Sequence, residues 1–231
     1  MRIIKSGIIT KDEVWQGNIR VVGDVVIEEN VTVKVSPATR ITFAEKSGYN
    51  CEEKFFTIRF INRECDVNCE EKCFILVKGK LICNGEKRKK IYIGNKNWDG
   101  GIIVAGSTYI KETLNFKKRR QIVKKTFIRI VPLKIYPYLS LKHTEVSGAS
   151  AGVYIHFFSL MSSSDSVFQR CKFGIIFSGT IFLLKNNILR NNDTGLFMPG
   201  AGLVKITQNL IEKNMKFGIF SRRGYGFNMG K

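Results

Sequence analysis

The stretch Asn187-Ile-Leu-Arg-Asn-Asn-Asp-Thr-Gly-Leu-Phe197 decides the fold, because the chain repeats its pattern at an almost constant spacing. Each copy has apolar residues, then a polar corner, then a glycine followed by an apolar doublet or triplet. The glycines of the pattern are 22, 21 and 23 residues apart and are Gly152, Gly174, Gly195 and Gly218. A period this short is typical of a stacked repeat. We expect these glycines to mark one corner of successive coils.

A third apolar segment completes each repeat. Ile181-Phe-Leu-Leu184 and Leu203-Val-Lys-Ile206 lie 22 residues apart, in step with the glycines. All these segments are short and rich in Ile, Val and Phe, which favours strands over helices. Three strands per repeat predict a coil of triangular cross-section. Its buried columns are expected to be Val153, Ile175, Leu196 and Ile219 in one row, and Phe168, Leu189 and Ile211 in another.

Residues 138–220 resemble the repeats written N-x-I-x-x-N-x-x-G-I in carbohydrate-binding and sugar hydrolase proteins of the pectate-lyase-like superfamily. The front of the chain resembles the opening of many secreted β-helix proteins. One departure is Ala38, where that family usually has glycine after the proline. The matching segments are Trp15-Gln-Gly-Asn-Ile, Gly23-Asp-Val-Val-Ile27, Val31-Thr-Val-Lys-Val-Ser-Pro-Ala-Thr-Arg-Ile-Thr-Phe43, Ile75-Leu-Val-Lys-Gly-Lys-Leu81 and Trp98-Asp-Gly-Gly-Ile-Ile103.

The resemblance implies an all-β fold, a single-stranded right-handed parallel β-helix (β-solenoid) that forms one domain over residues 1–231. Strands stack about 4.8 Å apart, so about eight coils would give a rod roughly 40 Å long. The resemblance also implies carbohydrate binding and an extracellular, cell-surface or periplasmic location. Met1-Arg-Ile-Ile-Lys-Ser lacks the apolar stretch of a signal peptide, so export would require a signal removed from this chain, and a cytoplasmic location stays open. No apolar run is long enough for a transmembrane helix.

Two segments interrupt the coil rhythm, and the first, residues 44–73, is rich in cysteine. It carries Cys51, Cys65, Cys69 and Cys73. Four cysteines in one excursion indicate disulfides, free thiols or a tetrahedral metal site. The C-x3-C-x3-C spacing differs from the C-x2-C of zinc knuckles, so we rank the metal site last and predict no cofactor. Cys171 takes the corner position of Asn192 and Asn214, where a small buried side chain is expected.

The second interruption, residues 106–136, is strongly basic. Loops held on a rigid scaffold commonly carry function, so these bases are candidate ligand-binding residues. The alternative is a solvated hairpin whose charges only keep the protein soluble. The candidates in this segment are Lys117, Lys118, Arg119, Arg120, Lys124 and Lys125.

Charge is the main functional clue in the sequence. Residues 113–231 hold 19 Lys and Arg against four Asp and Glu, whereas residues 1–112 hold 19 against 15. Because coils stack equivalent positions on one face, Arg170, Arg190 and Lys213 are expected to form a basic ridge. Such a ridge favours polyanions, with affinity that falls steeply with salt. Acidic polysaccharide, lipopolysaccharide, anionic lipid and nucleic acid all qualify, and charge alone does not choose among them. With the family resemblance, an anionic polysaccharide or other polyanion is the favoured partner, and nucleic acid ranks below it.

Catalytic groups are sparse in the repeat region. Glycosidases need two carboxylates roughly 5–10 Å apart, and the register puts Asp165 and Asp193 on different corners, with Asp193 beside Lys172 and Met215. Pectate-lyase-like enzymes use an Arg or Lys base with calcium held by acids. Arg170 and Arg190 near Asp193 are the weak catalytic candidates that this resemblance implies.

The histidines and asparagines have structural interpretations. His143 and His156 differ in context, and two histidines are few for a metal centre, so packed or exposed structural roles are expected. Asparagines recur at 22-residue intervals, which favours side-chain hydrogen bonds along the stack over a sugar-binding row. These asparagines are the pairs Asn187 and Asn209, and Asn192 and Asn214.

Three functional hypotheses follow. The favoured one is a non-catalytic exported β-helix that binds an anionic polysaccharide or surface polymer through its basic C-terminal half. The second is a polysaccharide lyase or glycoside hydrolase. The third is a structural or assembly module whose coil stack continues in further sequence or in another subunit, because a solenoid needs capped ends.

Overall fold

A computed structural model describes residues 2–50, 71–96, 98–105, 136–156, 158–178, 181–199 and 202–221 of the chain. These residues form 21 β-strands, and no helix occurs among them. The Cys-rich residues 51–70 and the basic residues 106–135 lie outside the described part of the chain. Within the described ranges there is also no helix that could span a membrane.

The strands lie on three faces of one coil. The first face holds β2 (Glu13–Trp15), β4 (Thr32–Val35), β7 (Lys80–Asn84), β10 (Tyr138–Lys142), β13 (Leu160–Ser164), β16 (Ile181–Lys185) and β19 (Leu203–Thr207). The second holds the start of β3 (Asn18–Ile27), β5 (Arg40–Phe43), β8 (Ile91–Gly94), β11 (Thr144–Ser147), β14 (Val167–Gln169), β17 (Ile188–Arg190) and β20 (Leu210–Glu212). The third holds the end of β3, β6 (Phe74–Val77), β9 (Gly101–Val104), β12 (Ala151–Ile155), β15 (Phe173–Phe177), β18 (Thr194–Met198) and β21 (Phe217–Ser221).

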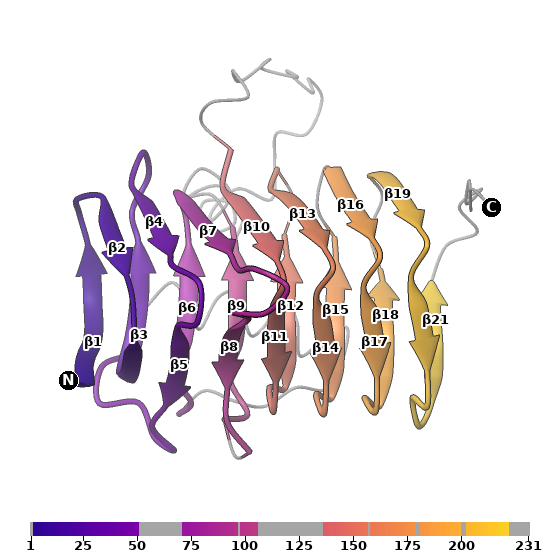
Figure 1. Ribbon diagram of the computed structural model, residues 1–231, viewed down its shortest axis with the longest axis horizontal. Helices are drawn as coiled ribbons and strands as arrows, with labels where there is room; N and C mark the ends of the chain where they lie inside the picture. Colours follow the sequence, from indigo (N-terminus) through magenta and orange to yellow (C-terminus); the bar gives the residue numbers. More distant parts are fainter. Residues whose placement is uncertain are drawn as a thin grey trace, which may run out of the picture.

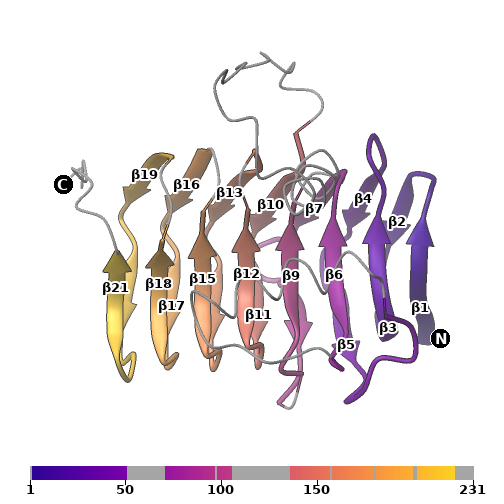
Figure 2. The ribbon, with the colours of Figure 1, turned by 180° about the vertical axis from the view of Figure 1, so that it is seen from behind.

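Every pair of neighbouring strands is parallel, so each coil lies directly on the previous one. Strands of the first two faces descend in front in Figure 1 while the chain advances from its N-terminus, and those of the third face ascend behind. Figure 2 shows the third face from its own side. This path is a right-handed coil, and the expected parallel β-solenoid is confirmed. The described residues make seven coils, and β1 (Arg2–Ile9) pairs with β3 at the N-terminal end.

The predicted inward columns are confirmed. Val153 pairs in register with Ile175, Ile175 with Leu196, and Leu196 with Ile219. The first three side chains are fully buried, whereas Ile219, in the last described coil, is 38% exposed. Burying a large aliphatic side chain contributes about 1.5–3 kcal/mol, so these columns provide much of the stability of the stack. The second predicted column, Phe168, Leu189 and Ile211, is also in register.

Two ladders of asparagine side chains lock the register at the corners. Asn187 Nδ2 donates to Asn209 Oδ1, and Asn192 Nδ2 donates to Asn214 Oδ1, each at 3.0 Å. The same oxygens accept the backbone N–H groups of Asn187 and Asn192. Ser166 and Cys171 continue the ladders one coil earlier, through their backbone N–H groups. The asparagines therefore stabilise the stack internally, as predicted, and Asn187 and Asn192 are buried away from any ligand.

The recurring glycines lie inside strands, which corrects the expectation that they mark a corner. Each is the second residue of β12, β15, β18 or β21. A Cβ atom on Gly174 would lie 2.6 Å from the carbonyl oxygen of Gly195, and the same contact recurs between Gly152 and Gly174. Steric contact between coils, rather than a left-handed backbone, therefore requires glycine in this column.

The third face has a second apolar layer on its outer side, which the sequence analysis missed. The outward row alternates with the inward column and is equally buried, at 1% exposure or less. The six side chains of this outward row are therefore as inaccessible to a ligand as the inward column. The outward row consists of Val26, Leu76, Ile103, Tyr154, Ile176 and Phe197.

The departure at Ala38 leaves the turn in the left-handed conformation that glycine would favour. Ala38 has φ of 62°, and its N–H donates to the carbonyl of Lys89 at 3.1 Å. The left-handed conformation is strained for a residue with a Cβ atom. The turn thus keeps its shape despite the substitution, because the neighbouring coil holds its backbone.

The Gly174→Ala variant should lose about 1–3 kcal/mol of unfolding free energy, since its Cβ would force two coils apart at a backbone contact. Gly218→Ala is the matched control, because the nearest atom to its Cβ is Ile211 Cγ2 at 3.3 Å. Urea-induced unfolding followed by circular dichroism measures both variants. Equal losses in the two would refute the role assigned to the glycine column.

Candidate functional site

The predicted basic ridge is formed only in part. Arg170 and Lys213 occupy equivalent positions of the second corner, which joins the second and third faces, with Asn191 between them. All three have a positive φ, between 53° and 55°, which directs their exposed side chains outward from the turn. The ridge is therefore interrupted at its middle coil.

Arg190 lies one position earlier, within β17 on the outer side of the second face. Its Nε donates to Gln169 Oε1 at 3.1 Å, and Gln169 Nε2 donates to Glu145 Oε1 at 2.8 Å. Arg190 therefore belongs to a polar row along the second face, and Glu145 offsets part of its charge. The sequence could not separate it from the corner residues, because the two positions are adjacent.

The other predicted ligand-binding and cysteine residues fall mostly outside the described residues. These are Lys117, Lys118, Arg119, Arg120, Lys124, Lys125, Cys51, Cys65 and Cys69. Cys73 is described and buried, and its Sγ donates to the carbonyl of Ala44 at 3.7 Å. No group of three or more metal-ligating side chains occurs within the residues that the structure describes.

A cleft of about 380 Å³ lies along the second corner, which forms the lower edge of the rod in Figure 1. It spans four coils, because its lining residues come from the turns that precede β9, β12, β15 and β18. Three cations, two carboxylates and several polar groups line it. The lining residues are Lys96, Asp99, Gly148, Ala149, Ser150, Arg170, Cys171, Lys172, Asn191 and Asp193.

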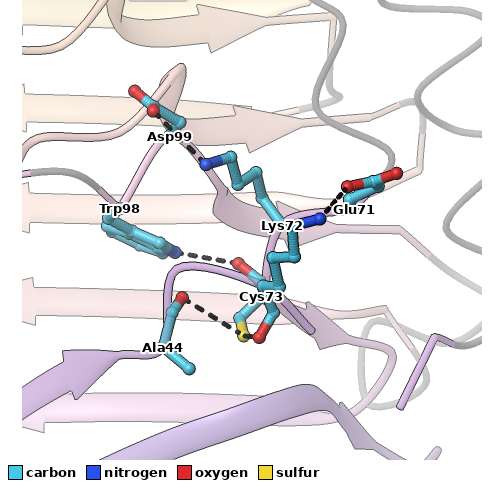
Figure 3. A network of polar contacts seen from close by, with 7 residues as sticks. Ala44, Glu71, Lys72, Cys73, Trp98 and Asp99 are labelled. Atoms are coloured by element: carbon cyan, nitrogen blue, oxygen red, sulfur yellow. Dashed lines mark hydrogen bonds and ion pairs between the residues drawn. The ribbon is translucent and has the colours of Figure 1, made fainter. Parts of the chain in front are cut away.

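Both carboxylates of the cleft are paired with lysines. Lys72 Nζ lies 3.7 Å from Asp99 Oδ2 (Figure 3), and Lys216 Nζ lies 4.0 Å from Asp193 Oδ2. The alignment of Asp193 with Met215 was wrong, because an extra residue in the last corner shifts the register and puts Lys216 opposite Asp193. Arg170 Nη2 in turn lies 3.9 Å from Glu145 Oε1, outside the lining of the cleft. The lining itself holds three cations, Lys96, Arg170 and Lys172, against two carboxylates that are already paired with lysines.

The carboxylates are too far apart for the paired acids of a glycosidase. Backbone hydrogen bonds link Asp99 to Gly148, Lys172 to Ala149, and Asp193 to Cys171, so three coil spacings separate Asp99 from Asp193. At about 4.8 Å per coil, this separation is roughly 14 Å, against the 5–10 Å that the reaction needs. Asp165 lies at the first corner, between the first and second faces, as predicted.

Trp98 fixes the N-terminal end of the cleft. Its indole Nε1 donates to the carbonyl of Cys73 at 2.8 Å (Figure 3), and its ring stacks on Phe43 with the centroids 3.8 Å apart. Trp98 is fully buried and directly precedes Asp99. The packed indole therefore positions Asp99, and with it the Lys72–Asp99 ion pair, at this end of the cleft.

The described cysteines of the coils are structural. Cys171 is buried below the cleft, and burial raises the pKa of its thiol to about 11. Burial likewise raises the pKa of the Cys83 thiol. A thiol that stays protonated at neutral pH is a weak nucleophile, so neither residue fits a catalytic role.

The two histidines occupy different environments. His143 lies at the first corner with φ of 45° and is partly exposed. His156 follows β12, is fully buried, and contacts Tyr154 in an edge-on arrangement with the ring centroids 5.5 Å apart. Burial lowers the pKa of His156 to about 3. Neither residue lines the cleft.

The buried His156 should make the fold less stable in mild acid. Between pH 6.5 and 3 the unfolded chain binds a proton that folded His156 does not, so the free energy of unfolding falls as the pH falls. At pH 5 the loss is at most about 2 kcal/mol. Urea unfolding at pH 7 and pH 5 should show a smaller pH dependence for His156→Leu than for the parent protein. An unchanged pH dependence would contradict this assignment.

Sequence reasoning missed several charged residues around the site. Lys96 and Asp99 come from a coil outside the regular repeats, so no period marks them. Lys172 was placed only as a neighbour of Asp193 in the alignment. At the first corner, away from the cleft, a run of four bases, Lys87-Arg-Lys-Lys90, was also overlooked, although consecutive like charges are a visible signal.

Comparison of the chain with protein-family models, with curated proteins and with solved structures finds no match. Its function is therefore inferred from the residues and their arrangement.

Proposed function

We propose that this protein is a non-catalytic β-helix that binds an anionic polysaccharide along its second corner. The observation that carries the proposal is the composition of the cleft, where three cations, Lys96, Arg170 and Lys172, lie beside two carboxylates already paired with lysines. The lining residues come from four successive coils, so the cleft extends along the rod axis, which suits a linear polymer better than a compact small molecule.

The side chains of the cleft match the groups of an acidic sugar. The planar guanidinium of Arg170, whose side chain is 68% exposed, can donate two parallel hydrogen bonds to a carboxylate or sulfate. The ammonium groups of Lys96 and Lys172 add two further positive charges to the cleft. Asn191, Ser150 and the outer oxygens of Asp99 and Asp193 offer partners for sugar hydroxyl groups.

The resemblance of the repeats to the pectate-lyase-like superfamily supports a saccharide ligand, and with it export to the cell surface, the periplasm or the extracellular space. A lyase or hydrolase of that superfamily is the alternative. The paired and widely separated carboxylates favour binding over this chemistry.

Binding should depend on the cations of the cleft. The double variant Arg170→Gln/Lys172→Gln should bind polygalacturonate about tenfold more weakly at low salt, because two contacts to the polyanion are lost. Its control is Lys11→Gln/Lys34→Gln, which removes the same charge from exposed positions outside the cleft. Isothermal titration calorimetry measures the affinity, and ultraviolet absorbance tests for unsaturated sugar products.

Equal weakening in the two double variants would refute the cleft as the binding site. The appearance of unsaturated product with the parent protein would replace the binding hypothesis by the lyase alternative. Absence of binding to any acidic polysaccharide at low salt would remove the proposed function.

A structural or assembly module is the second candidate, and the last described coil favours it. Five large apolar side chains are exposed there, with Leu203 72% and Met215 79% exposed. The strands of this coil also pair on one side only among the described strands. The other exposed side chains are Leu210, Phe217 and Ile219.

If this coil docks another coil, the protein should self-associate as its concentration rises. Leu203→Lys/Leu210→Lys should then reduce the sedimentation coefficient at high concentration, because two charges would be buried in the contact. Analytical ultracentrifugation measures this. A monomer at all concentrations, with the variant indistinguishable from it, would count against the module.

A further inference from the structure

A second basic surface lies at the first corner, on a different edge of the rod from the cleft. Six exposed cations gather there from the turn between β7 and β8 and from the ends of β10 and β16. None of them forms an ion pair with any other described residue. We name this surface the lysine corner, and its residues are Lys87, Arg88, Lys89, Lys90, Lys142 and Lys185.

The backbone holds the basic turn in place. Glu86 and Lys89 exchange two backbone hydrogen bonds, of 3.1 and 3.0 Å, which close a tight turn with Lys87 and Arg88 at its tip. Ala38 N–H of the preceding coil donates to the carbonyl of Lys89, and Gly85 N–H donates to the carbonyl of Lys142 in the following coil. The turn is therefore bonded to both neighbouring coils, beside the junction of β10 and β11 in Figure 1.

The charges continue along the axis of the rod. Lys142, Ser164 and Lys185 are in register at the ends of β10, β13 and β16. The two lysines are therefore two coils apart, which is about 10 Å. The acids at this surface are Glu86 and Asp165, so six cations face two carboxylates.

Repulsion among the six clustered cations lowers the free energy of unfolding of the protein. A bound polyanion would relieve this repulsion. Because the turn is already fixed by backbone bonds, binding there would require little further loss of conformational entropy. The line of charges parallel to the axis fits a linear anionic polymer that follows the rod.

The aromatic residues decide which polymer fits. Proteins that bind single-stranded nucleic acid stack bases on exposed aromatic rings. Tyr92 lies in β8, two residues after the basic turn, and the guanidinium of Arg40 lies over its ring, 4.8 Å from the centroid. A ring covered in this way offers no stacking platform for a base.

We propose that the lysine corner binds a sulfated or carboxylated glycan chain that runs along the rod, at a site separate from the cleft. This site does not depend on the proposed function of the cleft, because the two surfaces lie on different corners and share no residue.

The test uses the full chain and heparin as the sulfated glycan. Lys142→Gln/Lys185→Gln should lower heparin affinity about tenfold at low salt and reduce the dependence of log affinity on log salt by about two, since two ionic contacts are lost. Heparin should raise the melting temperature of the parent protein more than that of this variant. Lys142→Arg/Lys185→Arg should restore binding, because charge rather than shape is required.

Lys11→Gln/Lys34→Gln is the matched control, since both lysines are exposed and lie outside the lysine corner and the cleft. Circular dichroism without ligand checks that each variant folds.

A loss of heparin affinity in Lys142→Gln/Lys185→Gln no larger than that of the control would overturn the proposal. Tighter binding of single-stranded DNA of equal charge, lost in the same variant, would overturn the choice of a glycan. The Arg170→Gln/Lys172→Gln variant separates the surfaces, because it leaves the lysine corner intact.

Discussion

Hydrogen bonding between successive coils, along the axis of the rod, is the constraint on which the whole structure depends. A parallel stack leaves the backbone groups at each corner without strand partners, and buried polar groups need them. Asparagine side chains supply these partners at two corners by bonding both the backbone and the next asparagine. With the corners fixed, the inward columns align and the outward residues of each coil fall into rows. The cleft and the lysine corner are both products of this alignment.

Much of the fold could be predicted because the sequence repeats it. Gly174 and Gly195 gave the period, and Ile175 and Leu196 followed as inward residues. The reason for the glycines could not be predicted, because a contact between backbone atoms of successive coils has no signature in a single coil. The outer apolar row was also missed. A short run such as Phe173-Gly-Ile-Ile-Phe177 reads the same whether one or both of its sides are buried.

The sites were predicted less completely, for related physical reasons. Arg170 and Lys213 were placed on one corner correctly, because the repeat spacing fixes their register. Arg190 differs from them by one position, and a shift of one residue in a strand turns the side chain from the corner to the polar row beside Gln169. Lys96 and the Lys87–Lys90 turn belong to coils whose neighbours are distant in sequence. Only three-dimensional pairing brings Lys96 into one cleft with Lys172, and the Lys87–Lys90 turn beside Lys142.

The uneven spacing of paired strands has a consequence for the order of folding. Leu139, Met161 and Phe182 pair across only 21 or 22 residues, whereas Leu81 pairs with Val33 across 48 and with Leu139 across 58. Closing the longer loops costs roughly 1 kcal/mol more chain entropy for each contact. Short pairings also occur near the N-terminus, where Glu13 pairs with Val33 and Asn18 with Arg40, 20 and 22 residues apart. Both ends of the chain can therefore form coils locally, and the middle coils of β6, β7 and β8, which close the longer loops, gain from docking onto an existing template. The stack would thus form from its two ends toward its middle, and the order of its coils would not follow the direction of synthesis.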